Sequence, residues 1–368
     1  MSKSNDKDQL KKVLIIVYSD IMRDARVLKQ VAKYKEHNLT LLSFGQLAEK
    51  GVEQISIIDR YPLFYKIIGA VLLKLHLFMW YYWLLPVNRQ AYHLLKDKSF
   101  DLIIANDIYT LPLAVSIKKS AKLIYDAHEY YPREHDNKKM WMFFFHQYMN
   151  YLTQRFAPQA TQMLTVGYII ADEYKKNFGV EPEIVLNIPA YQEMSVNPLE
   201  EGKIKIVHHG VALEQRNLEL MIDVVKALGK PYTLDLYLVE FKKPYLDKLK
   251  GYVADINNVR ILPPLEQKEI VQRLNQYDIG MYFLKSKSFN DINCLPNKFF
   301  DFIQARLAVV IGPSPEMKRM VEKYQCGIAT RSFDTEEIIK EIRQLTPEEI
   351  YKMKGRAQLA SIGDSGSL

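Results

Sequence analysis

Two loops in the first half of the chain carry side chains that could serve a ligand. Asp126, His128 and Glu129 follow one apolar run, and Asp107 follows the apolar run before it. Parallel α/β sheets present ligand-binding side chains at the carboxyl ends of their strands, so we expect both loops to open on one edge of one sheet. A histidine and carboxylates in loops are more often surface or structural groups, and residue type alone leaves both interpretations open.

A second group of candidates surrounds a predicted helix start in the second half. Pro296 suits the first turn of a helix, because the donor that it lacks would have no partner there. The free backbone N–H groups of such a helix start can hold a phosphate. Lys298 adds a positive charge, and Asp301, one turn further on, could accept hydrogen bonds from ribose hydroxyls. The same spacing fits an ordinary capped surface helix with Lys298 and Asp301 in solvent.

The residues that end the first predicted strand of the second half form a third group. Gly210 would let a ligand approach the backbone closely, and Arg216 could bind a diphosphate through two nitrogens. The adjacent His208 and His209 point to opposite faces of a strand, so they cannot chelate one metal ion together. We predict no metal site in this sequence.

The elements that must position these groups follow the alternation of βαβ units. Short apolar runs alternate with amphipathic segments, and the fold class is α/β. The expected strands are residues 12–17, 39–44, 101–105, 123–125, 162–166 and 185–187, then 204–208, 232–239, 259–262, 279–283 and 308–311. Two doubly wound, Rossmann-like parallel-sheet domains are the economical interpretation. We expect the ligand in a cleft across which the two domains face each other.

The length and composition agree with two globular domains. The 368 residues exceed the size to which one hydrophobic core usually grows, and 48% apolar with 25% charged residues is typical of a folded protein. We expect an N-terminal domain over residues 1–190, a C-terminal domain over 191–345, and a C-terminal helix and tail over 346–368. A Pro-containing stretch near residues 188–200 would join the domains.

Charge and cysteine usage restrict the partners and the compartment. The formal net charge of +7 could favour anionic phosphates or lipids, but no nucleic-acid module or Lys/Arg block appears, so we expect no nucleic acid partner. The only two cysteines, Cys294 and Cys326, suggest no disulfide framework or zinc site. The polar N-terminus lacks a secretory signal, so a cytoplasmic protein is expected.

Two segments are unusually aromatic, residues 64–85 and 140–156, and they hold all three tryptophans. Lys74, His76 and Pro86 interrupt or close the first segment, so it lacks the uncharged run that a membrane-spanning helix needs. Aromatic residues interleaved with lysines suit a helix that lies in a membrane interface. Packing of these helices on the protein core is an equally good interpretation.

Taken together and in order, these residues resemble the retaining glycosyltransferases of family 4, which have the GT-B fold. The resemblance extends over nearly the whole chain. It rests on residues 24–27, 101–107, 125–129, 165–166, 187–189, 296–301, 315–317 and 326–327. It implies that His128 lies beside the donor sugar and that Arg216 and Lys298 neutralise the leaving diphosphate.

The same resemblance assigns the remaining donor residues. Asp301 matches the second glutamate of the family's Glu-x7-Glu signature, which binds the ribose, while the first glutamate is replaced by Asn293, for which Asp291 could substitute. Gly210 and Asn297 complete the donor-binding set. Retention of the anomeric configuration and independence of metal follow by the same analogy.

The sequence therefore predicts a retaining enzyme that moves a sugar from a nucleotide-sugar, most simply a UDP-sugar, to a saccharide or lipid-linked acceptor. This reaction fits cell-surface polysaccharide or glycolipid synthesis, and a location at the inner face of the plasma membrane would fit such a reaction. Asp107, Asp126 and Glu129 are the acceptor-side candidates, and His128, Arg216 and Lys298 the catalytic ones. No cofactor is expected, because the nucleotide-sugar is a substrate. A sugar-nucleotide epimerase and a non-catalytic GT-B subunit remain as alternatives.

Overall fold

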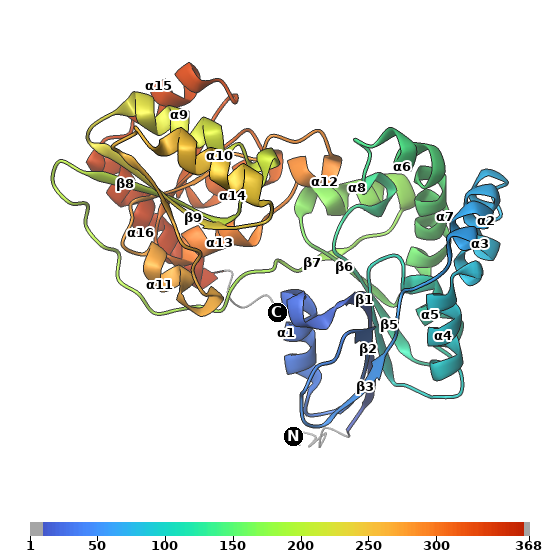
Figure 1. Cartoon of the computed structure of the whole chain (residues 1–368). Coiled ribbons are helices and arrows are strands. Elements are labelled where there is room, and N and C mark those ends of the chain that lie inside the picture. Colours follow the sequence, from blue (N-terminus) through green and yellow to red (C-terminus); the bar gives the residue numbers. More distant parts are fainter. Residues whose placement is uncertain (1–9, 364–368) are drawn as a thin grey trace, which may run out of the picture. The chain divides into compact units, whose positions relative to one another are not determined.

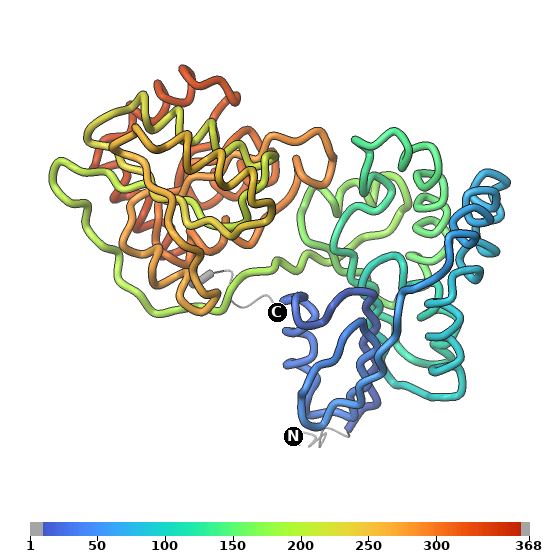
Figure 2. Tube along the Cα trace, viewed as in Figure 1, coloured from blue at the N-terminus to red at the C-terminus, as the bar shows by residue number. Residues whose placement is uncertain are grey.

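The computed structural model describes residues 10–363 (Figure 1). The chain forms two compact units. The first comprises the chain up to Val185 together with Ser288–Asn290, and the second comprises Leu186–Lys287 and the chain from Asp291 onward. The Cα trace passes through the first unit in blue to green and through the second in yellow-green to red (Figure 2).

The first unit is built on a seven-stranded parallel sheet. Its strands are β1 (Lys12–Asp20), β2 (Asn38–Phe44), β3 (Val52–Ser56), β4 (Leu102–Asn106), β5 (Lys122–Ala127), β6 (Gln162–Thr165) and β7 (Glu183–Ile184). They lie in the order β3-β2-β1-β4-β5-β6-β7. The chain reverses its direction of winding between β1 and β4, and ligands bind α/β sheets at such switch points.

Helices cover both faces of this sheet (Figure 1). They are α1 (Ala25–Tyr34), α2 (Leu63–Lys74), α3 (Phe78–Leu84), α4 (Pro86–Leu95), α5 (Leu111–Ile117), α6 (Lys139–Phe144), α7 (His146–Phe156) and α8 (Tyr168–Phe178). The side chains of β1 alternate between the two faces. Val13 and Ile15 pack in one apolar cluster with Val27 of α1, whereas Leu14 and Ile16 belong to the cluster on the opposite face. This is why β1 is apolar at every position.

The second unit holds a six-stranded parallel sheet in the order β10-β9-β8-β11-β12-β13. Its strands are β8 (Ile204–Val211), β9 (Tyr232–Val239), β10 (Val259–Leu262), β11 (Ile279–Tyr282), β12 (Ala308–Ile311) and β13 (Gly327–Ala329). Its helices are α9 (Leu218–Leu228), α10 (Lys243–Val253), α11 (Ile270–Leu274), α13 (Asn297–Gln304), α14 (Pro315–Tyr324), α15 (Thr335–Arg343) and α16 (Pro347–Gly363), while the short α12 (Phe289–Ile292) crosses the boundary between the units.

One glycine fixes the position of α13 on the second sheet. The ring of Phe302 packs so closely on Gly280 of β11 that a Cβ atom there would overlap the ring. A glycine at this strand position therefore lets α13 approach β11, and the approach sets where the side chains of α13 lie.

The predicted class, two doubly wound parallel α/β domains, is confirmed. The expected strand at residues 185–187 is wrong, because the sheet ends with the two-residue β7, Glu183–Ile184. The sequence pattern predicts neither β3 nor β13. Both are edge strands with mostly half-buried side chains, so neither has the continuous apolar run of a central strand.

The two aromatic segments divide between core and surface. In α3 and α7, Phe78, Tyr82 and Tyr148 are buried, so the interpretation as core holds for these helices. Trp80 is 73% exposed, and α6 buries no residue at all. Within residues 10–363 the structure has no helix that is both long and apolar enough to cross a membrane.

Candidate active site

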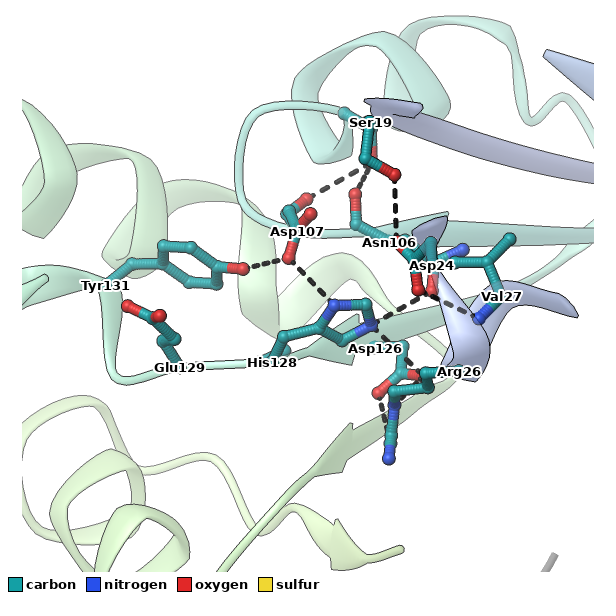
Figure 3. Close-up of polar contacts among 12 residues, drawn as sticks. Ser19, Asp24, Arg26, Val27, Asn106, Asp107, Asp126, His128, Glu129 and Tyr131 are labelled. Carbon is teal, nitrogen blue, oxygen red and sulfur yellow. Dashed lines mark hydrogen bonds and ion pairs between the residues drawn. The ribbon is translucent and has the colours of Figure 1, made fainter. Parts of the chain in front are cut away.

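The first group of candidates forms a cluster of Asp107, Asp126 and His128, here called the histidine cluster, at the carboxyl ends of β4 and β5 (Figure 3). Nδ1 of His128 lies 3.3 Å from Oδ1 of Asp107. Nε2 of the same ring lies 3.2 Å from Oδ1 of Asn106 and 3.6 Å from Oδ2 of Asp126. Both ring nitrogens therefore face oxygen acceptors, an arrangement that suits a doubly protonated ring.

The surroundings of His128 favour its charged form. Burial alone would lower its pKa, but Asp107 and Asp126 outweigh burial and raise the pKa from 6.5 to about 9. The ring is consequently an imidazolium at neutral pH. Its side chain is 20% exposed, so it can present this positive charge to a ligand.

Asp126 is held inside the first unit by a buried ion pair. Nε and Nη2 of Arg26 donate to its two carboxylate oxygens over 2.8 and 2.6 Å, and Gln30 donates a further hydrogen bond of 2.7 Å. Burial would raise the pKa of Asp126, but His128 and Arg26 hold it below its usual range. Its carboxylate is thus committed to holding Arg26 and facing His128.

Asp107 adopts a conformation that few residues other than glycine adopt. Its φ is +68°, a left-handed geometry that aspartate tolerates better than most residues, and its backbone N–H donates to the carbonyl oxygen of Asp126 over 3.0 Å. The Tyr131 hydroxyl donates to its carboxylate. Burial raises the pKa of Asp107, although His128 and Tyr131 oppose this. Strained residues of this kind are frequent in functional sites.

The third acceptor-side candidate, Glu129, points away from the His128 ring (Figure 3). Its carboxylate accepts a hydrogen bond of 3.3 Å from Nδ2 of Asn290, a residue of the same unit. The Tyr174 hydroxyl donates to its backbone carbonyl over 2.8 Å. These contacts tie Glu129 to α8 and α12 rather than to the histidine cluster.

In the second unit, Arg216 and Lys298 approach Gly210 together, and we call them the cation pair. Gly210 has a φ of +127°, and a Cβ atom on it would lie 2.8 Å from Nη1 of Arg216 and 3.0 Å from Nζ of Lys298. Gly210, Arg216 and Lys298 are all predicted donor-site residues, and the structure brings these three together.

Lys298 is buried and is not the solvated residue of the alternative interpretation. It is 6% exposed, and burial followed by the charge of Arg216 lowers its pKa well below the usual value. Arg216 donates a hydrogen bond of 2.9 Å to the carbonyl of Val211. Neither cation forms an ion pair with any residue that the structure describes, so an anion at this point would be strongly attracted.

The start of α13 adds backbone donors beside the cation pair. Pro296 is the N-cap residue, and its side chain accepts no hydrogen bond from the first turn. Asn297, its first residue, is exposed and accepts a hydrogen bond of 3.0 Å from Asn187. Helix starts with free N–H groups bind phosphates, so the geometry agrees with the predicted phosphate site.

Asp301 lies next to His209, with 3.4 Å between its Oδ2 and Nε2 of the ring. Burial raises the pKa of Asp301 to about 7. Burial, Lys298 and Arg216 lower the pKa of His209 to about 3, so this ring is neutral. The neighbouring histidine, His208, has a different partner from His209. Its Nδ1 lies 2.9 Å from the carbonyl oxygen of Met281.

Asn293 and Asp291, the two residues considered for the carboxylate position near the donor sugar, differ in their surroundings. Asn293 is buried, and Asp291 accepts a hydrogen bond of 2.7 Å from the Ser286 hydroxyl. Among residues 10–363, no group of three or more His, Cys, Asp and Glu side chains could hold a metal ion.

Each unit is a doubly wound parallel α/β domain of the kind that makes up the GT-B fold, one with the histidine cluster at the carboxyl edge of its sheet and one with the cation pair at a helix start. Residues 26–189 match the model of Glycosyltransferase Family 4, so the resemblance that the sequence showed to this family is confirmed. No curated protein matches the sequence well enough to count as a relative.

Solved structures agree with this fold. The chain superposes on Anabaena HepE in complex with UDP and glucose with a TM-score of 0.67 and 14% identity, over 95% of this chain and 94% of that one. For WaaG, a glycosyltransferase involved in lipopolysaccharide biosynthesis, the values are 0.66 and 13%, over 95% of each chain. A glycosyltransferase from Rickettsia africae gives 0.65 and 12%, over 96% of this chain and 94% of that one.

Proposed function

We propose that this protein transfers a sugar from a nucleotide-sugar, most simply a UDP-sugar, to a saccharide or lipid-linked saccharide with retention of configuration. The observation that carries the proposal is the cation pair, two positive groups that converge on Gly210 and form no ion pair within the described chain. A diphosphate supplies the missing negative charge. The solved structures of HepE contain UDP, UDP with glucose, or UDP-glucose, which supports uridine as the base.

The chemistry needs stabilisation of the nucleotide diphosphate as its bond to the sugar breaks. Positive charge that is already in place supplies such stabilisation without reorganisation at the moment of reaction. Arg216, Lys298 and the first turn of α13 take this part, and Asp301 accepts hydrogen bonds from the ribose. The imidazolium of His128 binds the donor sugar on the side of the N-terminal domain.

An exposed apolar surface on α2 and α6 supports an acceptor at a membrane. Leu63, Ile67 and Val71 follow one another at helical spacing, and each is more than half exposed. Phe143 of α6 belongs to the same surface, because Nζ of Lys74 on α2 donates to its carbonyl over 3.0 Å. Apolar residues flanked by lysines suit an anionic lipid surface. The predicted location at the inner face of the plasma membrane stays a prediction.

The test is a thermal-shift screen of the purified protein against UDP-, GDP-, ADP- and dTDP-sugars and the free nucleotides. A ligand at about a hundred times its dissociation constant stabilises the folded state by about 2.7 kcal/mol. Stabilisation by one nucleotide family, lost in Lys298→Met, supports the proposal. If none of these ligands stabilises the protein, a non-catalytic subunit is favoured. The replacement of the family's glutamate by Asn293 also favours that alternative.

Transfer itself needs a second measurement. Incubation with the stabilising nucleotide-sugar and a saccharide acceptor should release the nucleotide and give a product with the donor's anomeric configuration. Conversion of the donor sugar to its epimer without any acceptor would point instead to an epimerase.

A further inference from the structure

A cavity of about 270 Å³ lies within the first unit, on the face of the sheet that α3, α4 and α7 cover. Most of its wall is aromatic. Tyr18 at the end of β1 stacks on Phe44 at the end of β2, with 5.9 Å between ring centroids, and Tyr61 and Phe145 line other sides. Its position, near the carboxyl ends of two strands, is typical of a ligand site.

The wall contains two buried polar atoms that have no hydrogen-bond partner in the described chain, the hydroxyl oxygen of Tyr18 and Oδ1 of Asn88. Asn88 is 2% exposed, and its Nδ2 donates a hydrogen bond of 2.7 Å to the carbonyl of Tyr82. This bond fixes the orientation of the amide, so Oδ1 is its free acceptor, and no group of the described chain donates to it. A buried acceptor without a donor costs free energy, and a ligand hydroxyl that enters the cavity would remove this cost.

The cavity adjoins the histidine cluster through the loop after β4. Tyr109 lines the cavity, and Asp107 on the same loop faces His128 over 3.3 Å. The ring of Tyr109 packs edge-on against Tyr131, with centroids 5.9 Å apart, and the Tyr131 hydroxyl donates to Asp107. A molecule in the cavity would therefore touch Tyr109, which packs on the tyrosine that donates to Asp107.

We propose that this cavity binds one sugar ring of the acceptor; the proposal rests on the proposed function. Aromatic faces pack against the C–H faces of a sugar ring and leave its edge hydroxyls free, one of which donates to Oδ1 of Asn88. Asp59 at the rim accepts from another. The volume lies just below the usual range of ligand sites, which begins at about 300 Å³, and suits one ring. A lipid chain would leave Asn88 unpaired.

The test uses the full chain and five probes, the methyl glycosides of glucose, galactose, mannose, N-acetylglucosamine and rhamnose. Saturation-transfer NMR reports which probe binds and how tightly. In Leu85→Trp, a larger side chain fills the cavity from its wall. The matched control is Leu94→Trp, at a 44% exposed position of α4 that does not line the cavity. Tyr61→Ala removes one stacking face from a half-exposed position.

We expect at least one glycoside to bind the wild type and the control, to bind Leu85→Trp at least tenfold more weakly, and to bind Tyr61→Ala more weakly as well. No binding of any probe to the wild type, or equal binding to Leu85→Trp, would overturn the inference. UDP binding is measured on the same samples. The cation pair lies in the other unit, so the two binding events can be judged separately. If UDP binds and no glycoside binds, only the inference about the cavity is wrong. If a glycoside binds and UDP does not, only the proposed donor is wrong.

Discussion

Arg216 and Lys298 aim their positive groups at one point beside Gly210, although they come from different elements of the second unit. A buried lysine next to an arginine destabilises the fold, and the low pKa of Lys298 reflects that cost. An arrangement that costs stability and leaves positive charge uncompensated is typical of a site that gains its anion from a substrate.

Replacement of Lys298 should therefore separate stability from binding. In Lys298→Met the buried charge and its repulsion by Arg216 disappear, so the free energy of unfolding should rise by about 1 kcal/mol. UDP should bind about ten to a hundred times more weakly, because one charge-assisted hydrogen bond contributes about 1.5–3 kcal/mol. Chemical denaturation and calorimetric titration measure the two effects.

Lys250→Met serves as the control, because Lys250 is an exposed residue of α10. It should change neither stability nor UDP affinity. A Lys298→Met protein that binds UDP as tightly as the wild type would exclude Lys298 from the diphosphate site.

Gly210 gives a second test of the same site. Gly210→Ala introduces a Cβ atom that meets both cations at a φ of +127°, so UDP affinity should fall at least tenfold. Gly229→Ala is matched to it, because Gly229 also has a positive φ, +64°, but nothing lies within 4 Å of the added atom. Both variants should lose stability through backbone strain. If Gly210→Ala retains the UDP affinity of Gly229→Ala, close approach at Gly210 has no role in binding.

The charge of His128 makes a testable contribution to stability. Its pKa is raised from 6.5 to about 9 in the folded protein, so its stabilising effect is complete below pH 6.5 and is lost as the pH rises through 9. The advantage of the wild type over His128→Gln in free energy of unfolding should fall across this window, by roughly 3 kcal/mol at most. Denaturant titrations at several pH values test this. A pH-independent difference would show that folding does not change the pKa of His128.

The sequence predicted the central elements of the fold because buried parallel strands are apolar at every position. β1 is the clearest case, since Val13 to Val17 are fully buried and their side chains pack alternately on the two faces of the sheet. β3 reads V-E-Q-I-S and lies at the edge of its sheet, where one side needs no partner strand, so it has no such signal.

The candidate site was predictable as a set of residue types but not as a set of contacts. The spacing of Lys298 and Asp301 fitted a solvated helix as well as a phosphate site. Only the packing of Phe302 on Gly280 shows that α13 packs closely on the sheet. Arg26 received no role, because its partner, Asp126, is 100 positions away in the sequence. Pairing over such a distance depends on strand order, which local patterns do not contain.

The ion pair of Arg26 and Asp126 leads to the last prediction. Arg26→Met would leave Asp126, which is 1% exposed, without its cation, and it would also remove the hydrogen bond of 2.8 Å from Nη1 to the carbonyl of Val185. Breaking a buried pair from one side usually costs about 3–5 kcal/mol. Arg23→Met is the control, since Arg23 and Asp20 form an exposed pair at 3.6 Å, worth at most about 1 kcal/mol. Urea titrations measure the free energy of unfolding of both variants. If both lose the same small amount of this free energy, the buried pair does not stabilise the N-terminal domain.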